Sequence, residues 1–253
     1  MKNLEKLEKI ANEHPYPLLF ATVSGAHLYG FPSEDSDYDL RGVHILPLKN
    51  VVGIELGDDT LQIEEIREGL ELDLVTHDVK KFFELMLKRN GYVLEQLLSP
   101  LVVKTTPEHS DLIHISKRCL TKYHTHHYMG FAQNQWKLFL KETPQKVKQL
   151  LYVFRVLLTG IHLMRSGEVL ANLVELNEEY KITYISELID RKVNGAEKEI
   201  LPDADLPIFE QEYEKLLQTL VEAKEKSVLP EKPTAKDELN ELLIHLRLKK
   251  FNC

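Results

Sequence analysis

The hydrophobic period of the chain changes once, near His77, and this change limits the fold more than any other feature of the sequence. Before it, apolar residues alternate or form short continuous runs, which is the pattern of β-strands. After it, they recur every three or four residues, as in amphipathic helices. The sequence therefore predicts a front half that contains a sheet and a rear half built from helices.

The front half predicts one short helix and a small sheet. An amphipathic segment from Leu4 to Ala11 opens the chain, and Pro15 ends it. Strands are expected at residues 17–23, 37–46, 60–66 and 70–75. Glu68-Gly69 suits a turn between the last two strands. This arrangement indicates a small mixed or antiparallel sheet and an α+β fold class.

The rear half predicts helices separated by prolines. They are expected at residues 79–87, 93–98, 111–142, 145–167, 185–193, 206–226 and 235–250. We place a boundary near residues 100–107, which predicts a first domain of residues 1–105 and an all-α domain of residues 106–253.

Composition excludes several classes of protein. The 253 residues include 32 Lys+Arg and 40 Asp+Glu, a net charge of −8, so a generic basic RNA-binding module is excluded and phosphate contacts need a local basic patch or bound cations. Cys119 and Cys253 form no CxxC pair, which excludes disulfide scaffolds and cysteine zinc ribbons and favours a reducing compartment. No apolar run approaches the ~20 residues of a membrane span. We therefore expect a cytoplasmic protein with no membrane partner.

Residues 24–42 carry the most informative pattern. A predicted strand leads into a turn of small residues, Ser24-Gly25-Ala26, and the next strand begins with Asp37 and Asp39. Side chains two residues apart on a strand share a face, so these carboxylates should converge, with Cα atoms ~6.6 Å apart. Mg²⁺ neutralises such a pair, because it prefers hard oxygen ligands together with substrate phosphates. The alternative is an acidic loop without a metal ion.

Two further features fit a phosphate site. The Gly25 backbone can approach a phosphate closely, and the short helix that should follow offers free N–H groups. Asp73 lies inside an otherwise apolar strand, where an isolated carboxylate is costly unless it is solvated, paired or metal-bound. A third acid would complete a site for two cations ~3.5–4 Å apart.

These residues resemble the DNA polymerase β-like nucleotidyltransferase superfamily. Val23 to Ala26 matches its turn, Asp37-Tyr38-Asp39 matches its paired acids, and Asp73 matches its third acid. The closer resemblance is to the predicted nucleotidyltransferases of the RNA repair pathway DNA polymerase beta family. It rests on residues 28–30, 36–43, Asp73, Asn90 and 93–97, and continues through residues 128–132, 152–155 and 159–160.

The resemblance implies a nucleotidyltransferase of the EC 2.7.7 type. Such an enzyme moves a nucleoside monophosphate from an NTP to an acceptor hydroxyl and releases pyrophosphate. The expected acceptor is an RNA end; the alternatives are a protein or small molecule, or a nucleotide-binding protein with weak catalysis. The implied cofactors are two Mg²⁺ or Mn²⁺ ions on Asp37, Asp39 and Asp73, with Asp73 as the proton acceptor, and a helical domain closing the cleft.

The resemblance also implies nucleotide-binding residues around the turn. The superfamily usually has Gly or Ser where this chain has Ala26, so binding would rest on the backbone N–H groups of Gly25 and its neighbours or on Ser24. His27 is expected either to contact a phosphate or base or to be an exposed helix residue. Ser36, directly before the paired acids, belongs to the same predicted set.

Other polar residues have weaker predictions. Lys141, Lys148 and Arg155 recur every seven residues, which predicts a cationic wall for a triphosphate or, alternatively, a solvated helix face. Arg155 stands in an apolar run, so we expect it to pair with a phosphate or an acid. Arg41 is expected on the strand face opposite the acids, in a structural salt bridge rather than in contact with substrate.

The densest histidine cluster is His124, His126 and His127. It suggests zinc binding, contact with a nucleobase or acceptor RNA, or ordinary helix packing, and the last is favoured. Trp136 and Phe139 are expected in the core.

Overall fold

A computed structural model describes residues 3–194, 200–201 and 205–249, and it divides into two compact units. Unit 1 contains residues 1–25, 37–120 and 232–253, and unit 2 contains residues 26–36 and 121–231. The division differs from the predicted consecutive domains 1–105 and 106–253. Helices α6 (Pro107–Ser116) and α12 (Lys236–Leu248) belong to unit 1, and the loop 26–36 belongs to unit 2.

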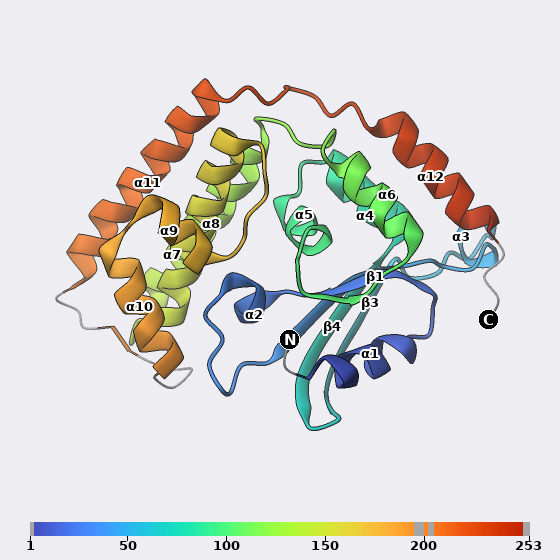
Figure 1. Cartoon of the computed structure of the whole chain (residues 1–253), viewed down its shortest axis with the longest axis horizontal. Helices are drawn as coiled ribbons and strands as arrows, with labels where there is room; N and C mark the ends of the chain where they lie inside the picture. Colours follow the sequence, from blue (N-terminus) through green and yellow to red (C-terminus); the bar gives the residue numbers. More distant parts are fainter. Residues whose placement is uncertain (1–2, 195–199, 202–204, 250–253) are drawn as a thin grey trace. The chain divides into compact units, whose positions relative to one another are not determined.

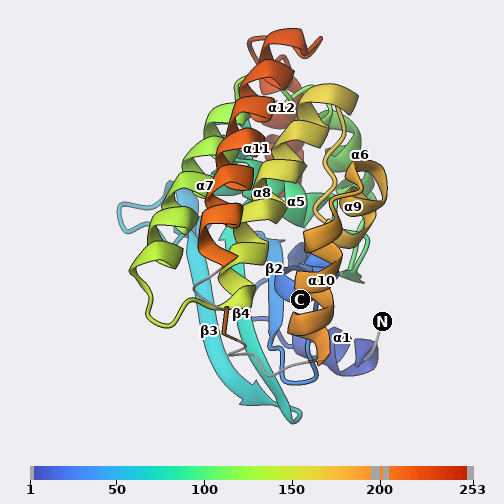
Figure 2. The same ribbon diagram turned by 90° about the vertical axis from the view of Figure 1, so that its left-hand side faces the viewer.

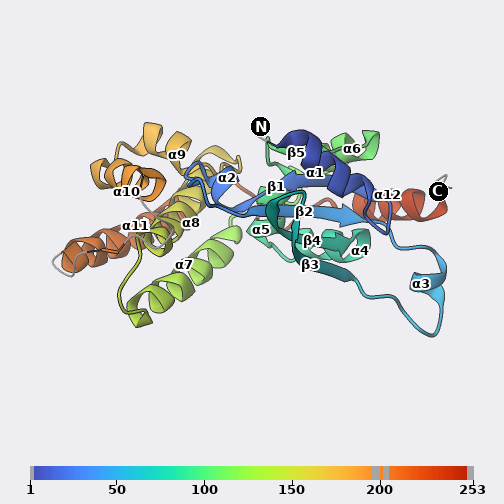
Figure 3. The ribbon, with the colours of Figure 1, turned by 90° about the horizontal axis from the view of Figure 1, so that it is seen from below.

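Unit 1 is built on a mixed sheet of five strands. They are β1 (Leu18–Val23), β2 (Tyr38–His44), β3 (Thr60–Arg67), β4 (Leu70–Asp78) and β5 (Val102–Lys104). Their order is β3-β4-β2-β1-β5, with β2 and β4 parallel and the other neighbours antiparallel (Figure 3). The sheet and the helical rear of the chain confirm the predicted α+β class.

The sequence predicted the central strands but not the short edge strand. Glu68 and Gly69 have φ angles of 54° and 75°, so they form the predicted turn, of the kind in which both central residues are left-handed. The β5 strand has only three residues, too few to show a period of two.

Helices cover both faces of the sheet (Figure 1). On one face α1 (Leu4–Asn12) buries Leu7 and Ile10 against apolar residues of β1, β2 and β4. On the other face lie α4 (Val79–Leu87), α5 (Gly91–Leu97) and α6, with α12 packed on α4 and α6. There the Phe20 ring stacks on His109, with ring centroids 4.4 Å apart. Unit 1 also contains the short helix α3 (Lys49–Val52).

Unit 2 is helical. Its three long helices, α7 (His124–Lys141), α8 (Val147–Ser166) and α11 (Leu206–Lys226), pack side by side (Figure 2). The shorter α9 (Leu173–Tyr180) and α10 (Thr183–Asn194) pack on α8. Trp136 and Phe139 are buried, as predicted. The predicted helix 111–142 is instead α6 and α7, because the chain passes between the units at residue 120.

The loop 26–36 contacts the helices of unit 2 through polar and aromatic side chains. The centroid of the Tyr29 ring lies 3.9 Å from the guanidinium carbon of Arg155, and the Tyr152 ring packs edge-on against the Tyr29 ring. The buried Lys192 ammonium donates to the Ser33 hydroxyl. The short helix α2 (Gly25–Tyr29) therefore begins in unit 1 and ends in unit 2.

One expectation about apolar runs was wrong. Helix α8 is long and apolar enough to cross a membrane by length and composition, but 78% of its apolar window is buried inside the protein. Core helices of soluble proteins have the same composition, so the finding supports membrane insertion only weakly. Cys119 is buried, and burial raises the pKa of its thiol to about 11, whereas Cys253 and Lys250 lie outside the described residues.

Two glycines should respond to alanine in opposite ways. Gly69→Ala forces a left-handed alanine into the hairpin turn and should lower the free energy of unfolding by about 1 kcal/mol. Gly130→Ala, in helix α7 where a Cβ meets no atom within 4 Å, should raise it by about 1 kcal/mol. Urea denaturation of both variants measures this, and a stabilising Gly69→Ala would contradict the turn.

Candidate active site

The register of β2 and β4 places two of the predicted acids side by side. In this parallel pair Asp39 is directly opposite Asp73. Their neighbours Leu40, Leu72 and Leu74 are buried in the cluster with α1, so the two carboxylates lie on the opposite face, where α5 packs. The pattern of alternation that buries the leucines thus brings two like charges together.

Arg41 lies between these carboxylates, which corrects its predicted position. One of its terminal nitrogens, Nη2, is 2.6 Å from Asp39 Oδ1 and 2.6 Å from Asp73 Oδ2. The expected salt bridge is present, but on the face of the acids rather than the opposite face. The reason is the strand period of two: Arg41 follows Asp39 by two residues and shares its face.

Every N–H donor of the Arg41 guanidinium has an acceptor. Besides the two carboxylates, it donates to the backbone oxygens of Leu40 and Asp73, and its Nε donates to the Tyr92 hydroxyl at 3.1 Å. A guanidinium has five N–H groups, so five bonds satisfy it completely. Burial alone would lower the pKa of Arg41, but Tyr92, Asp39 and Asp73 outweigh it and raise the pKa above its usual value.

The turn at Ser24 and Gly25 closes directly on Asp39. The Ser24 N–H donates to the Asp39 backbone oxygen at 2.8 Å. Gly25 has φ +60°, and a Cβ at this position would lie 1.8 Å from Asp39 Oδ2. Glycine is therefore required both by the backbone conformation and by the carboxylate beside it. The Ser24 hydroxyl is buried and has no hydrogen-bond partner among the described residues.

Asp37 is placed differently from the prediction. Strand β2 begins at Tyr38, so Asp37 precedes the ladder and the argument from strand alternation does not apply to it. Within residues 3–194, 200–201 and 205–249, no group of three or more His, Cys, Asp or Glu side chains is arranged to hold a metal ion. The structure thus joins Asp39 and Asp73, and the assignment of all three acids as metal ligands stays a prediction.

The donor chemistry of this site fits a divalent cation such as Mg²⁺. Carboxylate oxygens are the ligands that this ion prefers. Asp73 Oδ1 is buried and accepts no hydrogen bond from any described residue, so it lacks the partner that a buried acceptor normally has. Arg41 already compensates part of the negative charge, however, so the residues do not form a bare cluster of acids.

The other predicted nucleotide-binding residues belong to unit 2. Ala26 is buried, His27 is half-buried, and the Ser36 hydroxyl accepts a hydrogen bond from the Ser33 N–H at 3.0 Å. Lys148 and Arg155 lie on α8, whereas Lys141 ends α7, so the seven-residue spacing does not describe one helix. Their binding roles stay predictions.

Arg155 is only 2% exposed, and its guanidinium lies over the Tyr29 ring. The Tyr29 ring is thus one partner of Arg155, through a cation–π contact. The expected pairing with a phosphate or an acid stays a prediction.

The three predicted histidines do not form one cluster. The buried His124 bonds with Thr121, His126 is exposed beside Lys224, and His127 contacts Tyr128 and Phe131. Burial, with a smaller effect of Arg155, lowers the pKa of His127 to about 4. Within the described ranges they form no metal-binding group. Helix packing and contact with a nucleobase or acceptor RNA both stay predictions for them.

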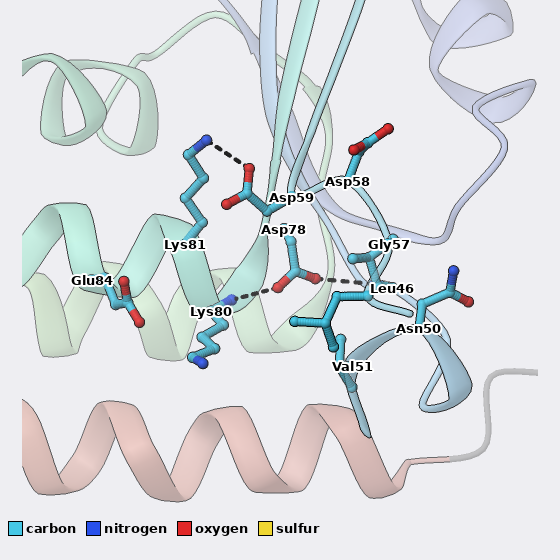
Figure 4. Close-up of a pocket in the computed structure, with 11 residues that line it drawn as sticks. Leu46, Asn50, Val51, Gly57, Asp58, Asp59, Asp78, Lys80, Lys81 and Glu84 are labelled. Atoms are coloured by element: carbon cyan, nitrogen blue, oxygen red, sulfur yellow. Dashed lines mark hydrogen bonds and ion pairs between the residues drawn. The ribbon is translucent and has the colours of Figure 1, made fainter. Parts of the chain in front are cut away.

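A cavity of about 400 Å³ lies at the other end of β2 and β4, and none of the predicted acids lines it. In it Asp78 accepts from the backbone N–H groups of Leu46 and Lys80, and Lys81 pairs with Asp59 (Figure 4). Asp78 also pairs with Arg247. The cavity contains neither the predicted acids nor the Ser24-Gly25 turn, so it is a weaker candidate than the site at Asp39.

Tyr92 was missed by the sequence analysis. Its hydroxyl accepts from Arg41, and it stands at the start of α5, directly after the residues Asn90 and Gly91. Asn90 caps this helix by accepting from the backbone N–H of Tyr92 at 3.0 Å. The cap was visible in the sequence as an Asn before a helical pattern, but the contact with Arg41 depends on tertiary packing.

The whole arrangement agrees with a comparison against protein families. The model of the RNA repair pathway DNA polymerase beta family matches residues 1–245. The chain belongs to this family. Membership confirms the predicted resemblance, and the family name denotes polymerase β-like nucleotidyltransferases of RNA repair.

Two relatives of this RNA repair family member are similar over most of their length. An uncharacterized protein of Methanocaldococcus jannaschii is 32% identical over 182 residues, 70% of this chain and 73% of its own. An uncharacterized protein of Bacillus subtilis is 28% identical over 252 residues, 96% of this chain and 94% of its own. The similarity therefore extends through both units.

The contact between Gly25 and Asp39 predicts a specific loss of stability. Gly25→Ala should lower the free energy of unfolding by about 2 kcal/mol or more, because it combines a left-handed alanine with a steric clash. In an Asp39→Ala background, which removes the closest side-chain atoms, the same change should cost only about 1–2 kcal/mol. Equal costs in both backgrounds, measured by urea denaturation, would contradict the contact.

Proposed function

We propose that this protein transfers a nucleoside monophosphate from an NTP to the hydroxyl of an RNA end and releases pyrophosphate. The observation that carries the proposal is the pairing of Asp39 and Asp73 across parallel strands beside the Ser24-Gly25 turn. Family membership supports the same reaction type.

The side chains of unit 1 suit distinct roles in this reaction. Ser24 has a buried hydroxyl that is free to donate to a phosphate oxygen, and Gly25 allows the backbone to approach it. Asp73 Oδ1 is the carboxylate oxygen that Arg41 does not contact, so it suits the acceptance of the proton from the attacking hydroxyl.

Divalent metal is part of the proposal. Asp37 and Asp39 would hold Mg²⁺, or Mn²⁺ in its place, through carboxylate oxygens. When bound, the ion would orient the triphosphate and neutralise the charge that develops on the leaving pyrophosphate. No covalent intermediate between the nucleotide and the protein is needed. We also propose that the protein acts in the cytoplasm, in agreement with the expected reducing compartment.

Label transfer tests the proposal directly. The protein is incubated with each α-labelled NTP, with Mg²⁺ or Mn²⁺, and with a panel of RNA 3′ ends. Label on RNA is the expected result. Label on a protein or small molecule would contradict the RNA acceptor, and NTP binding without transfer to any acceptor would contradict catalysis.

Conservative changes of the acids should abolish the transfer. Asp37→Asn, Asp39→Asn and Asp73→Asn should each lower the rate by about 100-fold or more, because each removes a charge but little volume. Asp58→Asn, an exposed residue outside the site, is the matched control and should keep the wild-type rate. A normal rate for Asp37→Asn would show that the metal assignment is wrong.

A further inference from the structure

We infer that Arg41 takes the place of a second metal ion: its guanidinium fixes Asp39 and Asp73 and limits the site to a single divalent cation. The inference rests on the proposed function, because that proposal supplies the first cation. Arg41 is thereby a positioning residue that acts through the two carboxylates.

The position of the guanidinium carries the first step of the argument. In two-metal sites the ions lie ~3.5–4 Å apart and share carboxylate ligands. Here one nitrogen of Arg41 is 2.6 Å from an oxygen of Asp39 and 2.6 Å from an oxygen of Asp73. A fixed positive charge thus stands where carboxylates would otherwise bridge to a second ion, and it repels a divalent cation from that place.

The hydrogen bonds of Arg41 carry the second step. All five N–H donors are used, and Tyr92 and two backbone oxygens anchor the group independently of the acids. The side chain is 9% exposed. A metal ion that replaced Arg41 between the two carboxylates would leave the Nη2 donors buried without acceptors, which is costly.

The net charge of the acids and Arg41 also favours a single divalent cation. With Asp37, which the proposed function adds to the site, the three acids carry three negative charges and Arg41 carries one positive charge, which leaves −2. One divalent cation neutralises this group, and two would leave it positive. The site thus needs a single ion before substrate binds.

The inference changes how the acceptor hydroxyl is activated. Its proton passes to Asp73 Oδ1, its oxygen bonds to the α-phosphorus, and the bond from that phosphorus to the bridging oxygen of pyrophosphate breaks. Asp73 rather than a second metal ion removes the proton, and Arg41 balances the charge of the carboxylate.

Mn²⁺ stoichiometry tests the inference without measuring activity. The full chain is titrated with Mn²⁺ alone, and the free ion is followed by electron paramagnetic resonance. Wild type should bind one ion, Arg41→Gln two, and Arg41→Lys, which keeps the charge, one. Arg67→Gln, which removes a partly exposed arginine from strand β3, is the matched control and should bind one.

Two ions on wild type, or one on a folded Arg41→Gln, would overturn the inference. If circular dichroism shows that Arg41→Gln does not fold, two other variants decide. Asp73→Asn should bind Mn²⁺ within threefold of wild type, because Arg41 already holds that carboxylate, whereas Asp37→Asn should bind it at least tenfold more weakly. A tenfold loss in Asp73→Asn would contradict the inference.

The outcomes separate this inference from the proposed function. The expected Mn²⁺ pattern without label transfer would contradict nucleotidyl transfer alone. Label transfer with two Mn²⁺ ions on wild type would contradict the role of Arg41 alone. A wild-type protein that binds no Mn²⁺ would contradict both.

Discussion

The ion pairs of Arg41 with Asp39 and Asp73 are the interaction on which the rest of the site depends. A parallel register between β2 and β4 puts two carboxylates directly opposite each other, and like charges in that position oppose strand pairing. The guanidinium removes this cost and adds a link to α5 through Tyr92. The same contacts therefore hold two strands and a helix together, and they set the charge of the place where chemistry is proposed.

Much of unit 1 could be predicted from local sequence, because its strands and its turn follow local rules. The left-handed Glu68-Gly69 pair and the buried strand 18–23 are visible as turn and period signals. The side of the sheet on which Arg41 lies was equally predictable, since a strand repeats every two residues, but the prediction placed it on the wrong face. Asp37 was harder, because strand ends depend on where pairing stops.

Contacts between segments distant in sequence could not be predicted in the same way. The apolar surroundings of Arg155 indicated that it needs a partner, yet the Tyr29 ring comes from a loop more than 100 residues away. The three neighbouring histidines illustrate the same point, since helix geometry sends His124 inward and His126 to the surface. Spacing predicts the face of a helix, but tertiary packing decides which neighbour each face meets.

The path of the chain between the two units has a consequence for synthesis. The chain crosses from one unit to the other after residues 25, 36, 120 and 231, so neither unit is a continuous segment. The sheet of unit 1 is translated before residues 121–231 of unit 2, whereas α12, which packs on α4 and α6 and supplies Arg247 to Asp78, is translated after them. Unit 1 therefore lacks α12 until residues 121–231 of unit 2 have been translated.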